Sequence, residues 1–271
     1  MEFPRDLLFR AAHTAVVAAI AGGQAALRAW RPRLGKSEKS APRDLVTDGD
    51  LAAQQAVCEE ISRAFPGYEI VSEEGTFPGS MGELRWVVDP IDGTTNYYHG
   101  LPFFAVSVAF CAGDEPLAGA VYDPVRHELF TGVLGNGAYL NGARIEAPCL
   151  RGLEEVVFGV GLSYSSGEMG EFLQLAARVA PLCSCVRSLG SAALALSYIA
   201  CGRMDCYLHP NLAIWDAAAG VLILREAGGL ITRFDGQPWV LGNGPSLAAN
   251  ASIHRQLLEQ LREALLSVRQ A

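Results

Sequence analysis

The chain has 271 residues, of which 50% are apolar and 18% are charged, and its formal net charge is −8. This composition supports a sizeable folded core and argues against a disordered chain. The acidic balance also argues against nucleic acid as a partner, because the phosphate backbone carries charge of the same sign.

Two helices are predicted at the start of the chain. The first runs from about Arg5 to Trp30, and a polar loop follows over residues 31–43. The second runs from about Asp48 to Phe65. Thr47 with Asp50 three residues later resembles a capping box, in which each side chain accepts a hydrogen bond from the other residue's backbone.

Short strands are expected after these helices. The apolar and β-branched residues near Glu69–Ser72 and Arg85–Asp89 predict two buried strands. From Phe103 to Leu140 the pattern changes to strands separated by turn residues, and Asn141-Gly142 closes this section. Such a pattern is typical of an antiparallel sheet.

The second half alternates between strands and helices. Strands are predicted near residues 156–159, 184–187, 204–208 and 230–233, and helices near 168–179, 191–201, 213–227 and 252–268. This alternation implies a more parallel sheet covered by helices. Since no flexible linker separates residues of about 1–145 from about 146–271, we expect residues 1–271 to form a single catalytic unit made of two halves.

The cysteines and the most apolar helix bear on the compartment. Seven cysteines occur without a C-x-x-C pair, so reduced thiols and a cytoplasmic protein are expected. The apolar stretch from Ala11 to Leu27 is too short to span a membrane comfortably and contains polar side chains. It is better explained as a helix packed on the body of the protein, so no membrane partner is expected.

The most informative segment is Asp89-Pro90-Ile91-Asp92-Gly93-Thr94-Thr95-Asn96, which follows the apolar residues Trp86-Val87-Val88. A strand that ends in this way presents carboxylates at a sheet edge and then opens a helical turn. Hard oxygen ligands beside free backbone amides suit a magnesium–phosphate site. Turn formation and helix capping alone also explain such residues.

Other acidic residues favour the metal site over turn formation. Glu73-Glu74 follows a predicted strand, and Trp215-Asp216 precedes a predicted helix. Adjacent carboxylates repel one another, so they are either solvated or hold a cation. The sequence therefore predicts metal-assisted phosphate chemistry.

Four strings resemble the inositol monophosphatase family in order and spacing: DLVTDGD (Asp44 to Asp50), SEEG (Ser72 to Gly75), DPIDGTTN (Asp89 to Asn96) and IWDAAAG (Ile214 to Gly220). The family comprises lithium-sensitive, magnesium-dependent phosphatases related to fructose-1,6-bisphosphatases and bisphosphate nucleotidases. The resemblance implies an α/β fold of layered α+β type, an α-β-α-β-α five-layer sandwich. It also implies a homodimer and two or three Mg²⁺ ions per site.

The resemblance further assigns roles to residues. Metal ligands would be Glu73, Asp89, Asp92, Asp216 and the Ile91 carbonyl. Water activation would fall to Thr94 with Asp50, aided by Glu73. Substrate-binding residues would be Gly93, Thr94, Thr95, Gly190, Ser191, Ala192, His209 and Asp216. For Asp50, a role confined to helix capping stays open.

The substrate is less well defined than the reaction. The expected substrate is a small polyol or sugar phosphate, such as inositol 1-phosphate. However, His209 stands where inositol-preferring relatives resemble one another in placing a glutamate, so either selectivity differs or His209 lies in a promiscuous pocket. Histidinol phosphate, fructose-1,6-bisphosphate and a nucleotide bisphosphate are alternatives. A regulatory interaction protein that retains the fold is an alternative of another class.

Overall fold

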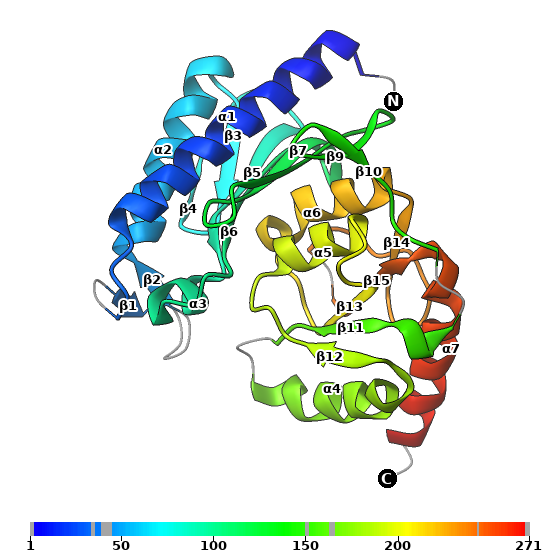
Figure 1. Ribbon diagram of the computed structural model, residues 1–271. Helices are drawn as coiled ribbons and strands as arrows, with labels where there is room; N and C mark the ends of the chain where they lie inside the picture. Colours follow the sequence, from blue (N-terminus) through cyan, green and yellow to red (C-terminus); the bar gives the residue numbers. More distant parts are fainter. Residues whose placement is uncertain are drawn as a thin grey trace.

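The computed structural model describes residues 3–33, 36–38, 45–149, 152–162, 166–242 and 244–268. Helices and sheets alternate in layers (Figure 1). Helices α1 (Arg5–Ala29) and α2 (Asp48–Ala64) cover one face of an eight-stranded sheet. Helices α5 (Ala192–Ala200) and α6 (Ile214–Glu226) lie between this sheet and a five-stranded sheet, whose other face is covered by further helices. This arrangement confirms the predicted α-β-α-β-α sandwich.

The two N-terminal helices and the capping box were predicted correctly. The Thr47 hydroxyl accepts hydrogen bonds from the Gly49 and Asp50 amides, and the Asp50 carboxylate accepts one from the Thr47 amide at 2.8 Å. The helices pack closely because α1 carries small residues where it meets its neighbours. A side chain at Gly22, for example, would place its Cβ 2.6 Å from a methyl group of Val57 on α2.

The residues between these helices differ from the prediction. Strand β1 (Lys36–Glu38) pairs antiparallel with β2 (Leu45–Thr47), so this part is a hairpin where a loop was expected. The backbone amides and carbonyls of the two segments satisfy each other, which a polar composition does not reveal. Of the expected loop, residues 34–35 and 39–43 lie outside the described residues, as does Asp44 of the DLVTDGD string.

The eight-stranded sheet has the order β10-β9-β8-β7-β6-β5-β3-β4. Its strands are β3 (Glu69–Ser72), β4 (Gly75–Phe77), β5 (Leu84–Asp92), β6 (Ala105–Ala112), β7 (Glu115–Asp123), β8 (Glu128–Val133), β9 (Gly137–Leu140) and β10 (Ala143–Ile145). Only the pair of β3 with β5 is parallel, so the antiparallel section is confirmed. Strand β5 extends beyond the expected end at Asp89, with a shift in its pairing to β6 between Asp89 and Asp92. Pro90 lies inside this irregularity because it has no N–H to donate.

The five-stranded sheet has the order β12-β11-β13-β15-β14. Its strands are β11 (Val157–Val160), β12 (Cys185–Arg187), β13 (Cys206–His209), β14 (Gly229–Thr232) and β15 (Ser246–Asn250). Strands β12, β11 and β13 are parallel, whereas β15 runs antiparallel to both of its neighbours. The expectation of a more parallel sheet is therefore correct for β12, β11 and β13 and wrong for β15 and its neighbours. Helices α4 (Ser166–Val179) and α7 (Ala251–Val268) cover the outer face (Figure 1).

Helix α6 fixes the position of the candidate site. Its residues from Ala217 to Leu224 are all buried between the two sheets. Glycines in the larger sheet let it approach: a Cβ at Gly119 would lie 3.1 Å from the Cβ of Ala219, and one at Gly132 would lie 3.2 Å from Ile223. The first turn of α6 is thereby held against the end of β5.

The seven cysteines are all free thiols. Within the described part of the chain, no helix has the length and hydropathy needed to cross a membrane.

Candidate active site

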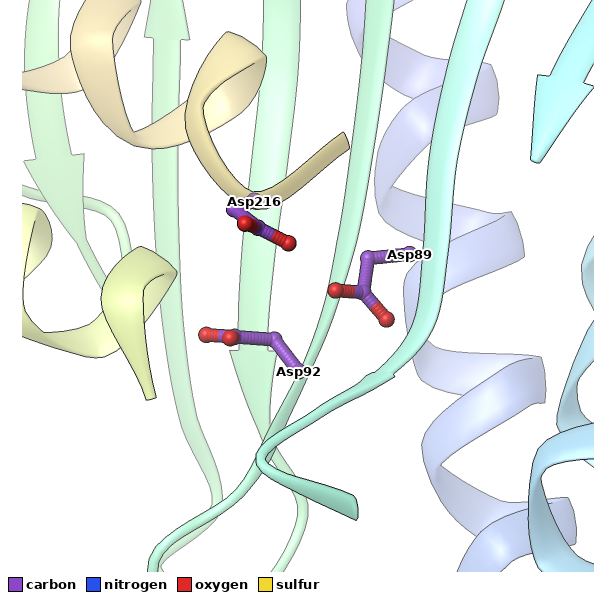
Figure 2. Close-up of side chains that lie close together, drawn as sticks. All are labelled: Asp89, Asp92 and Asp216. Carbon is purple, nitrogen blue, oxygen red and sulfur yellow. The ribbon is translucent and has the colours of Figure 1, made fainter. Parts of the chain in front are cut away.

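Three aspartates gather where β5 ends and α6 begins (Figure 2). Asp89 and Asp92 lie on β5 and are 2% and 6% exposed, and Asp216 lies in the first turn of α6. Each offers a carboxylate oxygen, and these oxygens all lie within 4.8 Å of one another. This set of closely spaced oxygen donors fits a hard cation such as Mg²⁺.

Local hydrogen bonds hold the first and third of these carboxylates. Asp89 accepts a hydrogen bond from the backbone amide of Ile91 at 3.0 Å. Asp216 accepts one from the amide of Ala213, just before the helix, at 3.0 Å. A carboxylate in the first turn of a helix is also favoured by the helix dipole.

Burial and mutual repulsion raise the pKa values of the buried pair. The pKa of Asp89 is well above its ordinary value because the group is buried and because Glu73, Asp92 and Asp216 are negatively charged. Its side chain also hydrogen bonds with that of Glu73. Burial likewise raises the pKa of Asp92 to about 6, against the opposing effect of its hydrogen bonds. A cation at this position would relieve the repulsion, so the donor set fits a metal ion.

Asp92 points toward the N-terminus of α5. Its carboxylate accepts hydrogen bonds from the Ala192 amide at 3.1 Å and the Ala193 amide at 2.7 Å, and a further one from the Ser191 hydroxyl. Ser191 also caps α5, since its hydroxyl accepts from the Leu194 amide at 3.3 Å. The N-terminus of α5 thus stabilises the charged form of an aspartate about a hundred residues earlier in the chain.

Thr94 and Asp50 form a buried pair next to this cluster. The Thr94 hydroxyl lies 2.9 Å from Asp50 Oδ1 and 3.0 Å from the Ile91 carbonyl oxygen, so either can accept its proton. The other carboxylate oxygen of Asp50 caps α2 through Thr47. One carboxylate therefore takes part in both interactions that the sequence left as alternatives. Burial raises its pKa to about 6, although its hydrogen bonds oppose this rise.

A tight turn connects β5 to α3 (Thr94–His99). Gly93 has a φ of +104°, and a Cβ there would lie 3.0 Å from the carbonyl oxygens of Phe103 and Gly190. Asn96 secures the same contact, since its side-chain amide donates to Phe103 and Leu189 carbonyls, both at 2.7 Å. The turn is therefore tied to the second half of the chain.

A cavity of about 270 Å³ brings most of the predicted residues together. Those that line it are Glu73, Asp89, Ile91, Asp92, Gly93, Thr94, Thr95, Gly190, Ala192, His209 and Asp216. Two predicted residues do not line it. Asp50 lies behind Thr94, and Ser191 is 1% exposed with its hydroxyl directed at Asp92.

Other residues lining this cavity were not predicted from the sequence: Asn96, Gly161, Leu162, Ser188 and Tyr207. Asn96 belongs to the DPIDGTTN string, so the sequence contained a signal that could have identified it as a site residue. The other four come from the ends of β11, β12 and β13, or just beyond them, and no local pattern distinguishes them from ordinary loop or core residues. Their place follows from tertiary structure alone.

Comparisons with known proteins identify the relatives of this chain. The inositol monophosphatase family model matches residues 10–268. The chain is 42% identical to a protein named inositol-1-monophosphatase from Mesorhizobium japonicum, over 83% of this chain and 85% of that one. It is 38% identical to a protein named Nus factor SuhB from Pasteurella multocida, over 82% and 84%.

A solved structure supports the same relationship. The crystal structure of the extragenic suppressor protein SuhB from Bartonella henselae has a TM-score of 0.87 and 36% identity, and the match covers 93% of this chain and 98% of that one. Matches of this extent leave no large part of the fold unaccounted for. The chain therefore belongs to the inositol monophosphatase family.

Proposed function

We propose that this protein hydrolyses phosphate monoesters in a magnesium-dependent reaction. The observation that carries the proposal is the cluster of buried Asp89 and Asp92 with half-buried Asp216, which shares a cavity with Thr94. These carboxylates repel one another when ionised, so their convergence is best explained by cation binding.

The residues that would hold Mg²⁺ are Glu73, Asp89, Asp92, Asp216 and the Ile91 carbonyl oxygen. When bound, Mg²⁺ neutralises charge on a phosphate ester and favours ionisation of water at neutral pH. The donor set consists only of oxygen atoms, as this ion prefers. The number of ions, expected to be two or three, stays a prediction.

Thr94 and Asp50 would orient the attacking water. When the Thr94 hydroxyl donates its hydrogen bond to Asp50, the hydroxyl oxygen is left to accept a hydrogen bond from a water molecule in the cavity. The carboxylate is buried and tied to the start of α2, which fixes the direction of the hydroxyl. Orientation of this kind lowers the barrier because little rearrangement is needed in the reaction.

Backbone groups of the β5–α3 turn would bind the phosphate. Gly93, Thr94 and Thr95 line the cavity, and the first helical hydrogen bond of α3 runs from the Tyr97 amide to the Gly93 carbonyl. Amides that precede this bond point away from the helix and are suited to an anion. Gly190, Ala192 and His209 line the side of the cavity that would face the alcohol.

Inositol 1-phosphate is the first substrate to test, because a relative that is 42% identical is named inositol-1-monophosphatase. Histidinol phosphate, fructose-1,6-bisphosphate and a nucleotide bisphosphate complete the first panel. A homodimer and inhibition by lithium are further proposals that rest on the family resemblance, and a cytoplasmic location is a proposal that rests on the cysteine usage.

The test is phosphate release by the purified protein with Mg²⁺ and with EDTA. We expect release only with Mg²⁺, and loss of release in Asp216→Asn. Asp114→Asn is the matched control, because it removes the same charge from a side chain that is 60% exposed in a distant turn. Release that persists in EDTA and in Asp216→Asn would contradict the proposal.

The same test separates the enzyme from a regulatory protein that retains the fold. Some relatives are named Nus factor SuhB. Those names belong to the relatives and assign no role to this chain. In this chain the acidic cluster and the Thr94–Asp50 pair are both present, which supports an enzyme. Absence of Mg²⁺-dependent release from every phosphate ester in the panel would favour the regulatory role.

A further inference from the structure

A second cavity adjoins the acidic cluster and continues away from it. It has a volume of about 570 Å³ and shares Glu73, Leu162, His209 and Asp216 with the first cavity. The residues that line only the second cavity are Asn211, Leu212, Ala213, Ile214, Trp215 and Gly242. Its volume lies within the range of small-molecule sites and exceeds what a phosphate group alone would fill.

The described residues that line this cavity carry no positive charge. Among the described residues that line the two cavities, none is a lysine or an arginine. His209 does not compensate, because burial lowers its pKa to about 4 and the ring is neutral near pH 7. A second phosphate on the substrate would therefore find no cationic side chain among the described residues of this wall.

The imidazole of His209 offers no free acceptor to substrate hydroxyls. Its Nδ1 accepts a hydrogen bond from the Asn211 amide at 3.2 Å. With Nδ1 accepting, the proton of the neutral ring resides on Nε2, so the ring has no second acceptor to offer. The side chain thus presents a flat ring where a polyol would need a hydrogen-bond acceptor.

Neighbouring residues hold the ring in this position. The His209 and Tyr207 rings lie 5.8 Å apart between centroids, at 35° to one another. Gly161 packs against both: a Cβ there would lie 2.1 Å from His209 Cδ2 and 2.1 Å from the Tyr207 hydroxyl. Rotation of the imidazole to free a nitrogen atom would therefore disturb a close-packed site.

Much of the remaining wall is apolar. Leu162 lines both cavities and is 52% exposed. Ile214 and Trp215, both partly exposed, add apolar and aromatic surface. An apolar group bound here would remove this surface from water, whereas the hydroxyls of a polyol would gain no such contribution from it.

We propose that the alcohol part of the substrate is a bulky, uncharged group with an apolar or aromatic face, so that monophosphates of such alcohols are preferred to inositol phosphates and to bisphosphates. This inference rests on the proposed phosphatase function and defines the substrate class of the same site.

The test compares kcat/KM for 2-phenylethyl phosphate, glycerol 1-phosphate, inositol 1-phosphate and fructose-1,6-bisphosphate. The first two are both esters of primary alcohols, which limits differences in leaving-group reactivity. We expect kcat/KM for 2-phenylethyl phosphate to exceed that for each of the other three esters by about 10-fold or more. This factor is typical of an apolar group in an apolar pocket. Equal or better use of inositol 1-phosphate or of the bisphosphate would overturn the inference.

The failure of the substrate class and the failure of the phosphatase function give different results. Hydrolysis of every ester with a preference for inositol 1-phosphate contradicts the substrate class alone. If no ester is hydrolysed, the phosphatase function fails, and calorimetry with the matched phosphonates then tests the pocket. Tighter binding of the 2-phenylethyl phosphonate supports the pocket chemistry, and tighter binding of the inositol phosphonate contradicts it.

Two variants test the residues that carry the inference. Leu162→Asn should lower kcat/KM for 2-phenylethyl phosphate about 10-fold relative to glycerol 1-phosphate. Leu173→Asn is the matched control, since this leucine is 46% exposed on α4 and lines neither cavity. His209→Glu adds an acceptor and should shift the ratio toward inositol 1-phosphate. An unchanged ratio in folded samples of both variants would contradict the inference.

Discussion

The candidate site has an acidic end, around Asp89, Asp92 and Asp216, and an end that we propose faces the alcohol, the second cavity around His209. Glu73 and Asp216 line both ends. The side chains at the two ends are fixed in different ways. At the acidic end, hydrogen bonds from backbone amides and hydroxyls fix charged groups that repel one another. At the other end, close packing fixes neutral groups, as with His209 against Gly161. The first end is thus suited to a reaction common to all phosphate esters, and the second to selection among them.

This comparison makes a clear distinction between two kinds of variant. Changes at the acidic end should lower activity by the same factor for every substrate. Changes at the alcohol-facing end, such as those proposed for Leu162 and His209, should alter the ratio between substrates. A variant of the acidic end that alters selectivity would show that the two ends are not separable.

The largest effect is expected for Asp89→Asn. The substitution removes one charge from the centre of the cluster, so turnover should fall by about 10³-fold or more, equivalent to about 4 kcal/mol of transition-state stabilisation. Steady-state kinetics with three different esters measures the loss for each, with Asp114→Asn as the control. Turnover near that of the unaltered protein would exclude a role for this carboxylate in metal binding.

The next largest effect is expected for the Thr94–Asp50 pair. Thr94→Ala should lower turnover by about 10²-fold or more while leaving Mg²⁺ affinity unchanged, since the hydroxyl is expected to orient a proton rather than to bind the metal. Asp50→Asn should cause a similar loss, and the double variant should lose little more because the two residues act as a unit. Thr94→Ser retains the hydroxyl and should retain most of the activity.

The dual contacts of Asp50 allow its two roles to be separated. If it only caps α2, Asp50→Asn should lower the free energy of unfolding by about 1 kcal/mol and leave turnover unchanged. Thermal melting and turnover on the same samples decide between these outcomes. Strict additivity of the two single losses would also argue against a coupled pair.

A smaller effect is expected for Ser191→Ala. The serine hydroxyl donates to Asp92, so its loss should weaken Mg²⁺ binding by about 10-fold to 100-fold, as is typical for a residue that orients a metal ligand. Calorimetric titration with Mg²⁺ measures this affinity. Loss of the α5 cap will appear separately as a lower melting temperature, and an unchanged affinity would contradict the orienting role.

The acidic end could be predicted from the sequence because its signals are local. The spacing of Asp89 and Asp92 after an apolar strand, and of Thr47 and Asp50 at a helix start, specifies both turn geometry and chemistry within a few residues. The contact of Ser191 with Asp92 could not be predicted in this way, because it depends on how α5 packs against β5. Nothing in the string around Ser191 distinguishes a helix cap from a residue that faces substrate.

Strand β15 was not predicted from the sequence, and the reason is also non-local. It consists of Ser246, alanines, Leu247 and Asn250, none of which is β-branched or aromatic, so its local preference for a strand is weak. It is nevertheless fully buried between β13 and β14, where tertiary pairing overrides propensity. The alcohol-facing cavity was equally hidden, because Leu162 and Gly242 are separated by most of the second half of the chain.

The metal-free protein should lose stability as the pH rises from about 4 to about 7. Burial raises the pKa of Asp50 and of Asp92 to about 6 from the ordinary value of 3.8. Between these values each aspartate binds more protons in the folded protein than in the unfolded chain, which lowers the free energy of unfolding as the pH rises. His209, whose pKa is lowered to about 4, acts in the opposite direction over the same range. Because two aspartates oppose one histidine, we expect a net fall of a few kcal/mol. Melting in EDTA at several pH values measures this slope. Mg²⁺ should restore stability at pH 7, and a metal-free slope of the opposite sign would contradict the raised pKa values.

The smallest effect is expected for Asn96→Ala, which weakens the connection between the two halves next to the site. The asparagine amide donates to two carbonyl oxygens at 2.7 Å, one of them from Leu189 in the second half of the chain. Leaving both without this donor should lower the free energy of unfolding by about 1 to 3 kcal/mol. Asn136→Ala is the matched control, since Asn136 donates only within its own turn, to Leu134 at 3.0 Å. If chemical denaturation gives equal losses for the two variants, Asn96 adds no more stability than a local turn contact. If Asn96→Ala instead lowers turnover without a loss of stability, this residue contributes to the chemistry at the acidic end rather than to the connection between the two halves.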